Sequence, residues 1–161
     1  MGIARNTRKK TRLKNPAADR ADRKGKKALL RRLLKTSKGN VLIFTIPENP
    51  LNIRAIFDDG KKTTQVAYIE GTEDKKSKTA IGLDVFTAPE FREVGVTTAM
   101  IRMFEQQAKM LRLKFSELKA VIRPSGDKVQ RRDTTPLLRK MGYKIEIPAG
   151  EYIGKGKKKL R

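Results

Sequence analysis

The sequence predicts a single α+β domain with a mixed, mainly antiparallel β-sheet and flanking helices, plus basic segments at both ends. Residues 41–86 form short apolar or alternating runs separated by turn residues, which is typical of strands. Residues 93–113 instead carry apolar residues three or four positions apart, which is typical of a helix packed on a sheet. The length of 161 residues is enough for one ordinary domain.

The first half of this domain is expected to be an antiparallel meander. Asp58-Asp59-Gly60 separates two of its strands and is a strong hairpin signal. A polar turn over residues 71–76 is expected before the fourth strand. The expected strands are 41–46, 52–57, 63–70 and 79–86.

The second half is expected to return to the sheet after the long helix. Residues 118–122 are a short apolar run that suits a central strand covered on both faces. A strand-helix-strand crossover implies that this strand pairs in parallel. Residues 130–141 predict a second helix, with Pro136 tolerable only in its first turn, and residues 143–147 predict a last strand.

Positive charge is concentrated at the two ends of the chain. Of the net charge of +22, residues 1–40 contribute +13, from 15 Lys and Arg against 2 Asp, and residues 155–161 contribute +5. Residues 41–154 therefore carry only +4. The expected organisation is a basic extension at residues 1–39, a domain at 40–154 and a basic tail at 155–161.

The first extension is expected to contain one short amphipathic helix. Leu29, Leu30, Leu33 and Leu34 fall on one helical stripe flanked by cations, and Gly39 is placed to end such a helix. Packing on the core is the preferred interpretation, and a basic helix on a membrane or partner is the alternative. Residues 1–27 offer almost nothing to bury, so we expect them to be disordered unless bound.

The basic segments point to a polyanionic partner, with the phosphate backbone of nucleic acid or a nucleoprotein as the leading candidate. The alternatives are solubilising segments without a ligand and an anionic membrane surface. Aromatic residues are absent from both segments, so base stacking and sequence-specific readout are not expected. The candidate nucleic-acid-binding residues are Arg5, Arg8, Lys9, Lys10, Arg12, Lys14, Lys26, Lys27, Lys157, Lys158 and Lys159.

Composition excludes several kinds of chemistry. The chain has no Cys and no His, which excludes thiol catalysis, disulfides, zinc fingers and His-based general bases, and no metal site is expected. No run approaches the roughly 20 apolar residues of a membrane span, and no signal-peptide core follows the start. We therefore expect a soluble protein, in the cytoplasm or inside a nucleoprotein particle.

The most informative segment is 85–101, between the fourth expected strand and the long helix. A turn at a helix N-terminus points backbone N–H groups outward, where they and the helix dipole attract a phosphate. Gly95 would permit close approach of a ligand to this backbone. A glycine that merely punctuates the chain before a helix is the alternative interpretation.

This segment resembles the acyl-CoA-binding motif of the Gcn5-related N-acetyltransferases (GNAT), in which a strand leads into a Pro-x-x-Arg-x-x-Gly-x-Gly/Ala turn and then a helix. Pro89, Arg92 and Gly95 occupy matching places, as do Val96, Ala99 and Met100. Residues 136–143 are similar to a second family signature, in which a helix ends in a Gly-aromatic pair. The two motifs cover about residues 80–147 and imply the GNAT fold.

The resemblance implies acetyl-CoA as cofactor. In the family, the turn holds the pyrophosphate and the pantetheine arm pairs with the strand before the turn. Two residues depart from the pattern: Thr97 stands where the family has Gly or Ala, and Leu138 stands where many members have the tyrosine that protonates the departing thiolate. Carried over, the cofactor-binding residues are Val85, Phe86, Thr87, Arg92, Glu93, Val94, Gly95, Val96 and Thr97.

Catalytic groups are harder to assign. Asp84 and Glu70 are the carboxylates nearest the expected cleft and are the candidate bases, with solvated strand-end acids as the alternative. Tyr68 and Tyr143 are candidate acids, with buried core tyrosines as the alternative. The chain also lacks the pair of amphipathic helices that follows the family's first strand.

Two functions remain open on the sequence. The first is an acetyl-CoA-dependent N-acetyltransferase tethered to nucleic acid or nucleoprotein by its basic segments. The second is a catalytically inactive GNAT-fold protein that binds or builds a nucleoprotein assembly, such as a virion or a ribosome-like particle. A peripheral membrane protein is the least supported.

Overall fold

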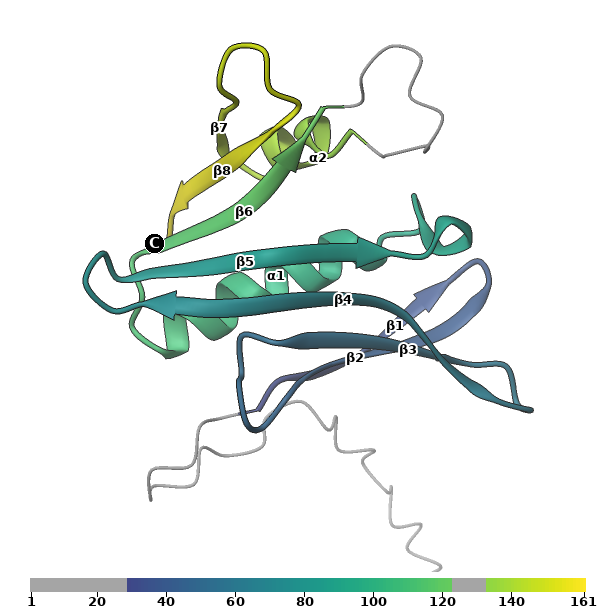
Figure 1. The fold of residues 1–161 in the computed structure, drawn as a ribbon. Coiled ribbons are helices and arrows are strands. Elements are labelled where there is room, and N and C mark those ends of the chain that lie inside the picture. Colours follow the sequence, from purple (N-terminus) through teal and green to yellow (C-terminus); the bar gives the residue numbers. More distant parts are fainter. Residues whose placement is uncertain (1–28, 123–132) are drawn as a thin grey trace, which may run out of the picture.

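The computed structural model describes residues 29–122 and 133–161. It contains one eight-stranded sheet with the order β1-β2-β3-β4-β5-β6-β8-β7 (Figure 1). The helices are α1 (Val96–Met110) and α2 (Thr135–Lys140), and a 3₁₀ turn, η1, spans Pro89–Phe91. The strands are β1 (Arg31–Thr36), β2 (Gly39–Thr45), β3 (Ile53–Asp58), β4 (Thr63–Asp74), β5 (Thr79–Thr87), β6 (Phe115–Val121), β7 (Lys144–Glu146) and β8 (Ile153–Lys159).

The predicted antiparallel meander is confirmed for β2 to β5. The turn between β3 and β4 is the predicted Asp-Asp-Gly hairpin: Asp58 accepts the Gly60 N–H at 2.8 Å, and Gly60 has a φ of +84°. Asp59 accepts the N–H groups of Lys61 and Lys62, each at 2.8 Å. These hydrogen bonds hold the pKa of Asp59 below its ordinary value.

The amphipathic helix expected around residues 28–35 is wrong, because this segment forms the edge strand β1. Strand β1 pairs with β2 so that Leu34 lies opposite Val41 and Leu33 lies opposite Leu42. Gly39 does not end a helix: with a φ of +125° it closes a tight hairpin and begins β2. Pairing with β2 gives the backbone N–H and C=O groups of this segment hydrogen-bond partners. This stabilises the strand more than burial of four leucines on one side would stabilise a helix.

The turn expected at residues 71–76 is also partly wrong, because β4 continues to Asp74 and pairs there with Thr79. Gly71 is therefore a strand residue. A Cβ atom at this position would come within 2.5 Å of the Leu51 carbonyl oxygen and 2.8 Å of the Phe104 ring. The glycine is needed for close packing and not for a turn.

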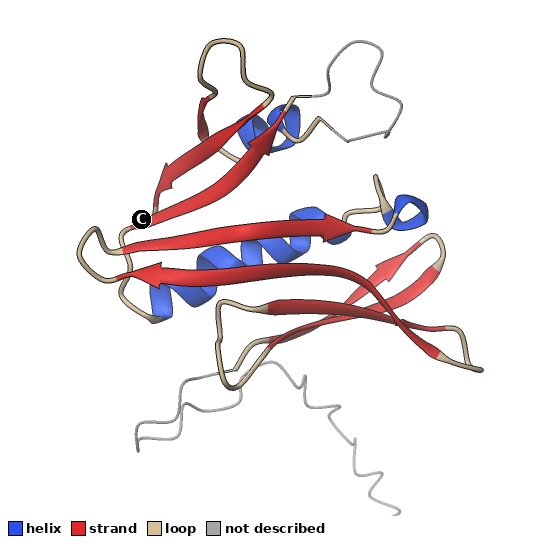
Figure 2. Ribbon diagram, viewed as in Figure 1, coloured by secondary structure: helices blue, strands red, loops and turns tan. Residues whose placement is uncertain are grey.

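Helix α1 forms the main core with one face of the sheet, as its apolar spacing predicts. Met100 and Phe104 of α1 are fully buried, together with Ile43, Ile53 and Ile69 of the strands. Helix α2 lies on the same face as α1 (Figure 2). The other face, which we call the open face, is covered by no helix in the part of the chain that the structure describes.

The crossover from β5 through α1 to β6 gives the predicted parallel pair. Pro136 lies in the first turn of α2, as predicted, where its missing N–H has no intrahelical acceptor to lose. Residues 130–132, the expected start of this helix, lie outside the described residues. None of the helices described is long and apolar enough to span a bilayer.

The basic tail expected at residues 155–161 is wrong for most of its length, because Ile153–Lys159 is strand β8. This strand lies inside the sheet, with β6 on one side and β7 on the other. Gly156 of β8 is buried. A Cβ atom at this position would lie 3.0 Å from the Ile145 side chain and 3.3 Å from the Leu138 side chain. We refer to β1–β5 with α1 as the N-terminal half and to β6–β8 with α2 as the C-terminal half.

Candidate active site

The two halves of the sheet join through a short pairing and then separate. Strands β5 and β6 pair over four positions, from Thr79 opposite Phe115 to Gly82 opposite Leu118. The register between β4 and β5 shifts at the same point, which leaves Leu83 as an extra residue of β5. Such a bulge bends a strand and increases its twist. Beyond it, β5 and β6 diverge and leave an opening between them (Figure 1).

A cavity of about 620 Å³ lies in this opening. Its wall includes the end of β5, the first turn of α1, Lys119 of β6 and Leu137 of α2. Six of the nine predicted cofactor-binding residues line it, namely Val85, Phe86, Thr87, Arg92, Glu93 and Thr97. Val94, Gly95 and Val96 are not part of the wall but belong to the same turn.

The turn that leads into α1 is held by its own hydrogen bonds. The Phe91 N–H donates to the Ala88 carbonyl at 2.9 Å, and the Arg92 N–H donates to the Pro89 carbonyl at 3.2 Å. The Phe91 side chain is buried, and its ring lies 5.1 Å from that of Phe57. The Arg92 Nε–H donates to the Thr87 carbonyl at 3.2 Å, which fixes the guanidinium at the cavity.

Helix α1 begins with unsatisfied amides. Its first intrahelical bond runs from the Ala99 N–H to the Gly95 carbonyl at 3.0 Å, so the N–H groups of Val96, Thr97 and Thr98 have no intrahelical acceptor. The N-cap is Gly95, which supplies no side-chain acceptor. Gly95 has a φ of +90°, a conformation that favours glycine. Free amides and the positive end of the helix dipole together favour an anion here.

Thr97 differs from the family pattern but has a defined contact. Its hydroxyl lies 2.7 Å from the hydroxyl of Thr87, at the end of β5. The branched side chain therefore ties the first turn of α1 to β5 and also lines the cavity.

Positions 138 and 143, where a general acid could have been placed, do not line the cavity. Leu138 is buried at 2% exposure and is not part of the cavity wall. Tyr143 is also buried, with its hydroxyl 2.7 Å from that of Ser116, and burial raises its pKa. Tyr143 is therefore a core residue, the alternative that the sequence left open.

The two candidate carboxylates lie on the open face beside the cavity. The Tyr68 hydroxyl donates to Asp84 at 2.9 Å, and this bond is the main reason that the pKa of Tyr68 is raised. Glu70 forms an ion pair with Arg54 at 2.5 Å. The ring of Tyr68 stacks on Phe86, with centroids 5.5 Å apart, and Phe86 also lines the cavity. Asp84 is thus connected to the cavity wall through Tyr68 and Phe86.

The structure describes only part of the predicted nucleic-acid-binding set. Lys157, Lys158 and Lys159 belong to β8. Lys158 forms an ion pair with Glu105 of α1, at 2.9 and 3.0 Å, and Lys157 lies 4.9 Å from the centre of the Phe115 ring. The remaining candidates, Arg5, Arg8, Lys9, Lys10, Arg12, Lys14, Lys26 and Lys27, lie outside the described residues.

Sequence reasoning missed the C-terminal side of the cavity. Lys119 lines it from β6, and Asp133 and Thr134 line it just before α2. Lys119 had a usable signal, because it is a lone cation inside an apolar strand that was expected to pair in parallel with β5. No cluster of acidic side chains that could hold a metal ion is found among residues 29–122 and 133–161.

Comparison with known proteins identifies the fold. The structure matches Ard1 from Thermoplasma volcanium with a TM-score of 0.53, over 70% of this chain and 72% of that chain, at 14% identity. It matches a protein of the GNAT acetyltransferase family from Desulfovibrio desulfuricans with a TM-score of 0.54, over 83% and 100%, at 13% identity. The chain has the fold of the Gcn5-related N-acetyltransferases.

A third structure with this acetyltransferase fold is the PaiA N-acetyltransferase from Thermoplasma acidophilum, in complex with coenzyme A. It matches with a TM-score of 0.51, over 68% of this chain and 60% of that chain, at 20% identity. No family model and no curated protein matches the sequence. The relation to the acetyltransferase fold is therefore carried by the arrangement of the strands and helices.

Proposed function

We propose that this protein binds acetyl-CoA between β5 and β6 and transfers its acetyl group to an amine. One observation carries the proposal: the cavity between the separated strands reaches the first turn of α1 at Thr97, whose backbone amide has no intrahelical acceptor. A cavity of about 620 Å³ is within the usual range for small-molecule and cofactor sites. The PaiA structure, which has the same fold, holds coenzyme A.

The residues present fit such a cofactor. The backbone amide of Thr97 and the guanidinium of Arg92, both at residues of the cavity wall, would hold the diphosphate. The pantetheine arm carries two amide groups, so it can pair with the edge of β5 that β6 leaves free at Val85–Thr87. In this arrangement the thioester would lie toward Gly82 and Leu118, where the strands join.

Acetyl-CoA supplies an activated acyl group whose C–S bond breaks as a C–N bond forms to the acceptor amine. The amine must lose a proton, and Asp84 is the carboxylate placed on the open face to accept it, held by the Tyr68 hydroxyl. With leucine at position 138, this chain offers no tyrosine there, so the thiolate must take its proton from water. Proximity still provides a large part of the rate.

Cofactor binding tests the proposal directly. At about 100-fold excess over Kd, coenzyme A adds about 2.7 kcal/mol of stability, which corresponds to a rise in Tm of about 5–10 °C. Thr97→Asp should abolish this rise, because it puts a negative charge into the cavity wall at the phosphate position. The folded protein should remain stable, since an acidic residue in the first turn of a helix is favourable.

Thr98→Asp is the matched control, with the same charge one residue further along α1. Thr98 does not line this cavity, so the rise in Tm should largely persist. No rise with the unmodified chain at millimolar coenzyme A would contradict the proposal and leave the inactive GNAT-fold protein as the better interpretation.

The base is tested separately. Asp84→Asn should lower the rate of acetyl transfer about 100-fold and leave coenzyme A binding unchanged, because Asp84 does not line the cavity. Glu73→Gln, an exposed position on the neighbouring strand, is the control. An Asp84→Asn variant with full activity would remove this residue from the mechanism.

Binding to nucleic acid is the second part of the proposed function, and one surface favours it. A hollow lined by residues of β7, β8 and the end of α1 carries six cations and two carboxylates. The cations are Lys109, Lys144, Lys157, Lys158, Lys159 and Arg161. An excess of positive charge of this kind is complementary to a phosphate backbone.

The salt dependence of binding tests this second part. The logarithm of the association constant for double-stranded DNA falls linearly with the logarithm of the salt concentration. Replacing Lys157 and Lys159 together by alanine should make this negative slope shallower by about 2. Replacing Lys61 and Lys62 at the β3–β4 turn removes the same charge elsewhere and should leave the slope nearly unchanged. Equal effects of the two double variants would show that only net charge matters.

A further inference from the structure

We propose that Lys119 is a self-acetylation site, modified by the acetyl-CoA bound beside it. This inference deepens the proposed function and rests on it, because the acetyl donor is the proposed cofactor. Its basis is the position of one amine in the wall of the cavity.

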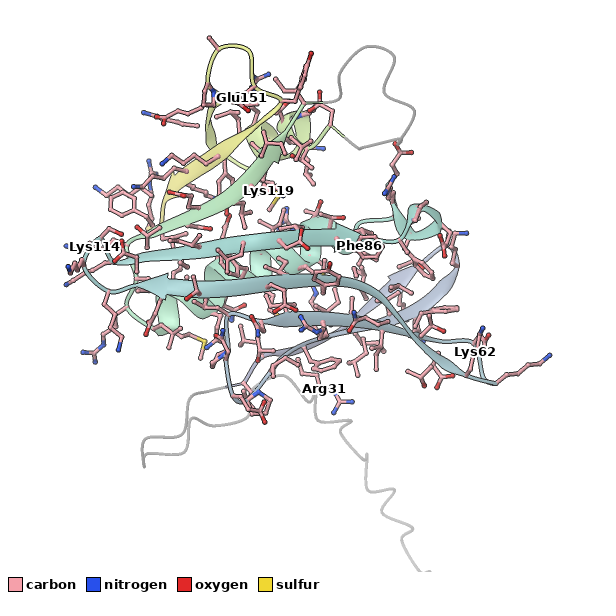
Figure 3. All side chains as sticks on the ribbon, viewed as in Figure 1. Arg31, Lys62, Phe86, Lys114, Lys119 and Glu151 are labelled. Carbon is pink, nitrogen blue, oxygen red and sulfur yellow. The ribbon has the colours of Figure 1, made fainter. Side chains whose placement is uncertain are left out.

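Among the described residues that line the cavity, Lys119 carries the only primary amine. The other cation of the wall is the guanidinium of Arg92, which stays protonated and is no nucleophile. The exposed Lys119 side chain is accessible to a donor in the cavity and to water that removes its proton. Figure 3 labels Lys119 on β6 and Phe86 on β5, on the two sides of the opening.

The position of Lys119 along β6 matters more than its presence in the wall. The last pair between the two strands is Gly82 with Leu118, so Lys119 is the first residue of β6 beyond the join. A cofactor with its diphosphate at the first turn of α1 and its arm along β5 would have its thioester toward this end of the opening. The amine of Lys119 would then lie near the thioester.

Lys119 also lies on the acceptor side of the sheet. Its neighbours Leu118 and Ala120 are buried in the core, and side chains of a strand alternate between faces. Lys119 therefore projects to the open face, which also carries Asp84 and Tyr68. This is the face from which the proposed acceptor amine approaches.

The step balances without any further reagent. The ammonium of Lys119 first loses one proton to water, and the neutral nitrogen attacks the thioester carbon. The C–N bond forms, the C–S bond breaks, and the second proton of the nitrogen passes through water to the sulfur. The products are Nε-acetyl-Lys119 and free coenzyme A.

The test is peptide mapping of the intact chain by mass spectrometry after incubation with acetyl-CoA. One acetyl group per chain is expected at Lys119, at a rate independent of protein concentration. Lys155 is the internal reference, because it lies directly opposite Lys119 on β8, is exposed and does not line the cavity. Lys119 should react at least about 100-fold faster than Lys155, as expected for a bound donor.

Two variants complete the experiment. Lys119→Arg keeps the charge and should remove the modification, whereas Lys155→Arg should leave it intact. Thr97→Asp, which keeps Lys119 but loses the cofactor, should reduce the rate at Lys119 to that of Lys155. Equal rates at the two lysines in the unmodified chain would mean ordinary chemical acetylation and overturn the inference.

Coenzyme A binding is measured on the same samples by its effect on Tm, which separates the two proposals. If coenzyme A raises Tm and Lys119 stays unmodified, the self-acetylation inference is wrong and the proposed function stands. If coenzyme A gives no rise in Tm, the proposed function fails first and the inference fails with it.

Discussion

The N-terminal half of the sheet packs its long strands on the 15-residue helix α1, whereas the C-terminal half packs on the six-residue helix α2. In the N-terminal half, fully buried aliphatic and aromatic side chains fill the space between helix and sheet. In the C-terminal half, Leu138 and Tyr143 are buried against Gly156 of β8. The contacts between the two halves include the four residue pairs of β5 and β6 and the ion pair between Glu105 and Lys158.

This difference separates the source of stability from the position of the site. The N-terminal half has the apolar area to fold a domain, since buried apolar surface is the main favourable contribution. The C-terminal half has fewer such contacts and depends on close backbone packing. The cavity lies between the two, so one wall belongs to the half with the larger buried apolar core and the other to the half with fewer buried apolar side chains.

The largest effect is expected in the core of the N-terminal half. Phe104→Ala should lower the free energy of unfolding by about 4 kcal/mol, because it removes a fully buried ring that packs on Gly71. Urea denaturation measures the loss. Gln106→Ala, exposed on the same helix, should change it by less than about 0.5 kcal/mol. A small effect of Phe104→Ala would contradict the comparison between the halves.

A single methyl group should disturb the C-terminal half. A Cβ atom at Gly154 would lie 2.1 Å from the Glu146 carbonyl oxygen, so Gly154→Ala should separate β7 from β8 at a cost of about 3 kcal/mol. Hydrogen exchange should show the loss in β7 and β8 and leave α1 protected. A Cβ atom at Gly60 would have no atom within 4 Å, so Gly60→Ala should lower the free energy of unfolding by only about 1 kcal/mol, because of the positive φ at this position. Equal protection in both halves would mean that they unfold together.

The ion pair across the junction should have an intermediate effect. Lys158→Met leaves Glu105 without its cation in a site where that side chain is only 12% exposed, and should cost about 2 kcal/mol. The double variant with Glu105→Leu should recover part of this loss. A double-mutant cycle in urea measures the coupling, and a value near zero would show that the pair does not hold the halves together.

The smallest effect concerns pH. Burial raises the pKa of Tyr143, so the folded state favours the neutral phenol, and this contribution to stability is fully present below the ordinary pKa of 10.0. Stability should therefore fall as the pH rises above about 10. Tyr143→Phe should remove this dependence while losing about 1 kcal/mol with the Ser116 hydrogen bond. Tyr152→Phe, at an exposed position, should leave the alkaline dependence in place.

The parts of the fold that the sequence predicted well are those whose apolar residues follow the period of their element. Strands β2 to β5 and helix α1 bury residues at the spacing that the sequence displays. Strand β8 reads Ile-Gly-Lys-Gly-Lys-Lys-Lys, with no apolar alternation after its first residue. Its position is set by β6, β7 and α2, and a charge pattern alone cannot show such neighbours.

The candidate site also has one part that the sequence predicted and one part that it did not. The turn of residues 92–97 has a recognisable motif, and the structure brings it to the cavity, although its role toward a cofactor stays a prediction. On the opposite wall, Lys119 is marked only as a lone cation in an apolar strand, and Thr134 and Leu137 have no local signature, because these residues meet the turn only through the parallel crossover. When two segments meet only in the folded structure, the sequence of each segment alone does not show which of its residues will line a shared cavity.

The strand order has a consequence for biosynthesis. Strand β7 precedes β8 along the chain, yet in the sheet β8 lies between β6 and β7. While the ribosome is making this chain, β7 leaves the exit tunnel with its neighbouring place in the sheet still empty. The N-terminal half can form during translation, whereas the far wall of the cavity must wait until the residues of β8 have emerged.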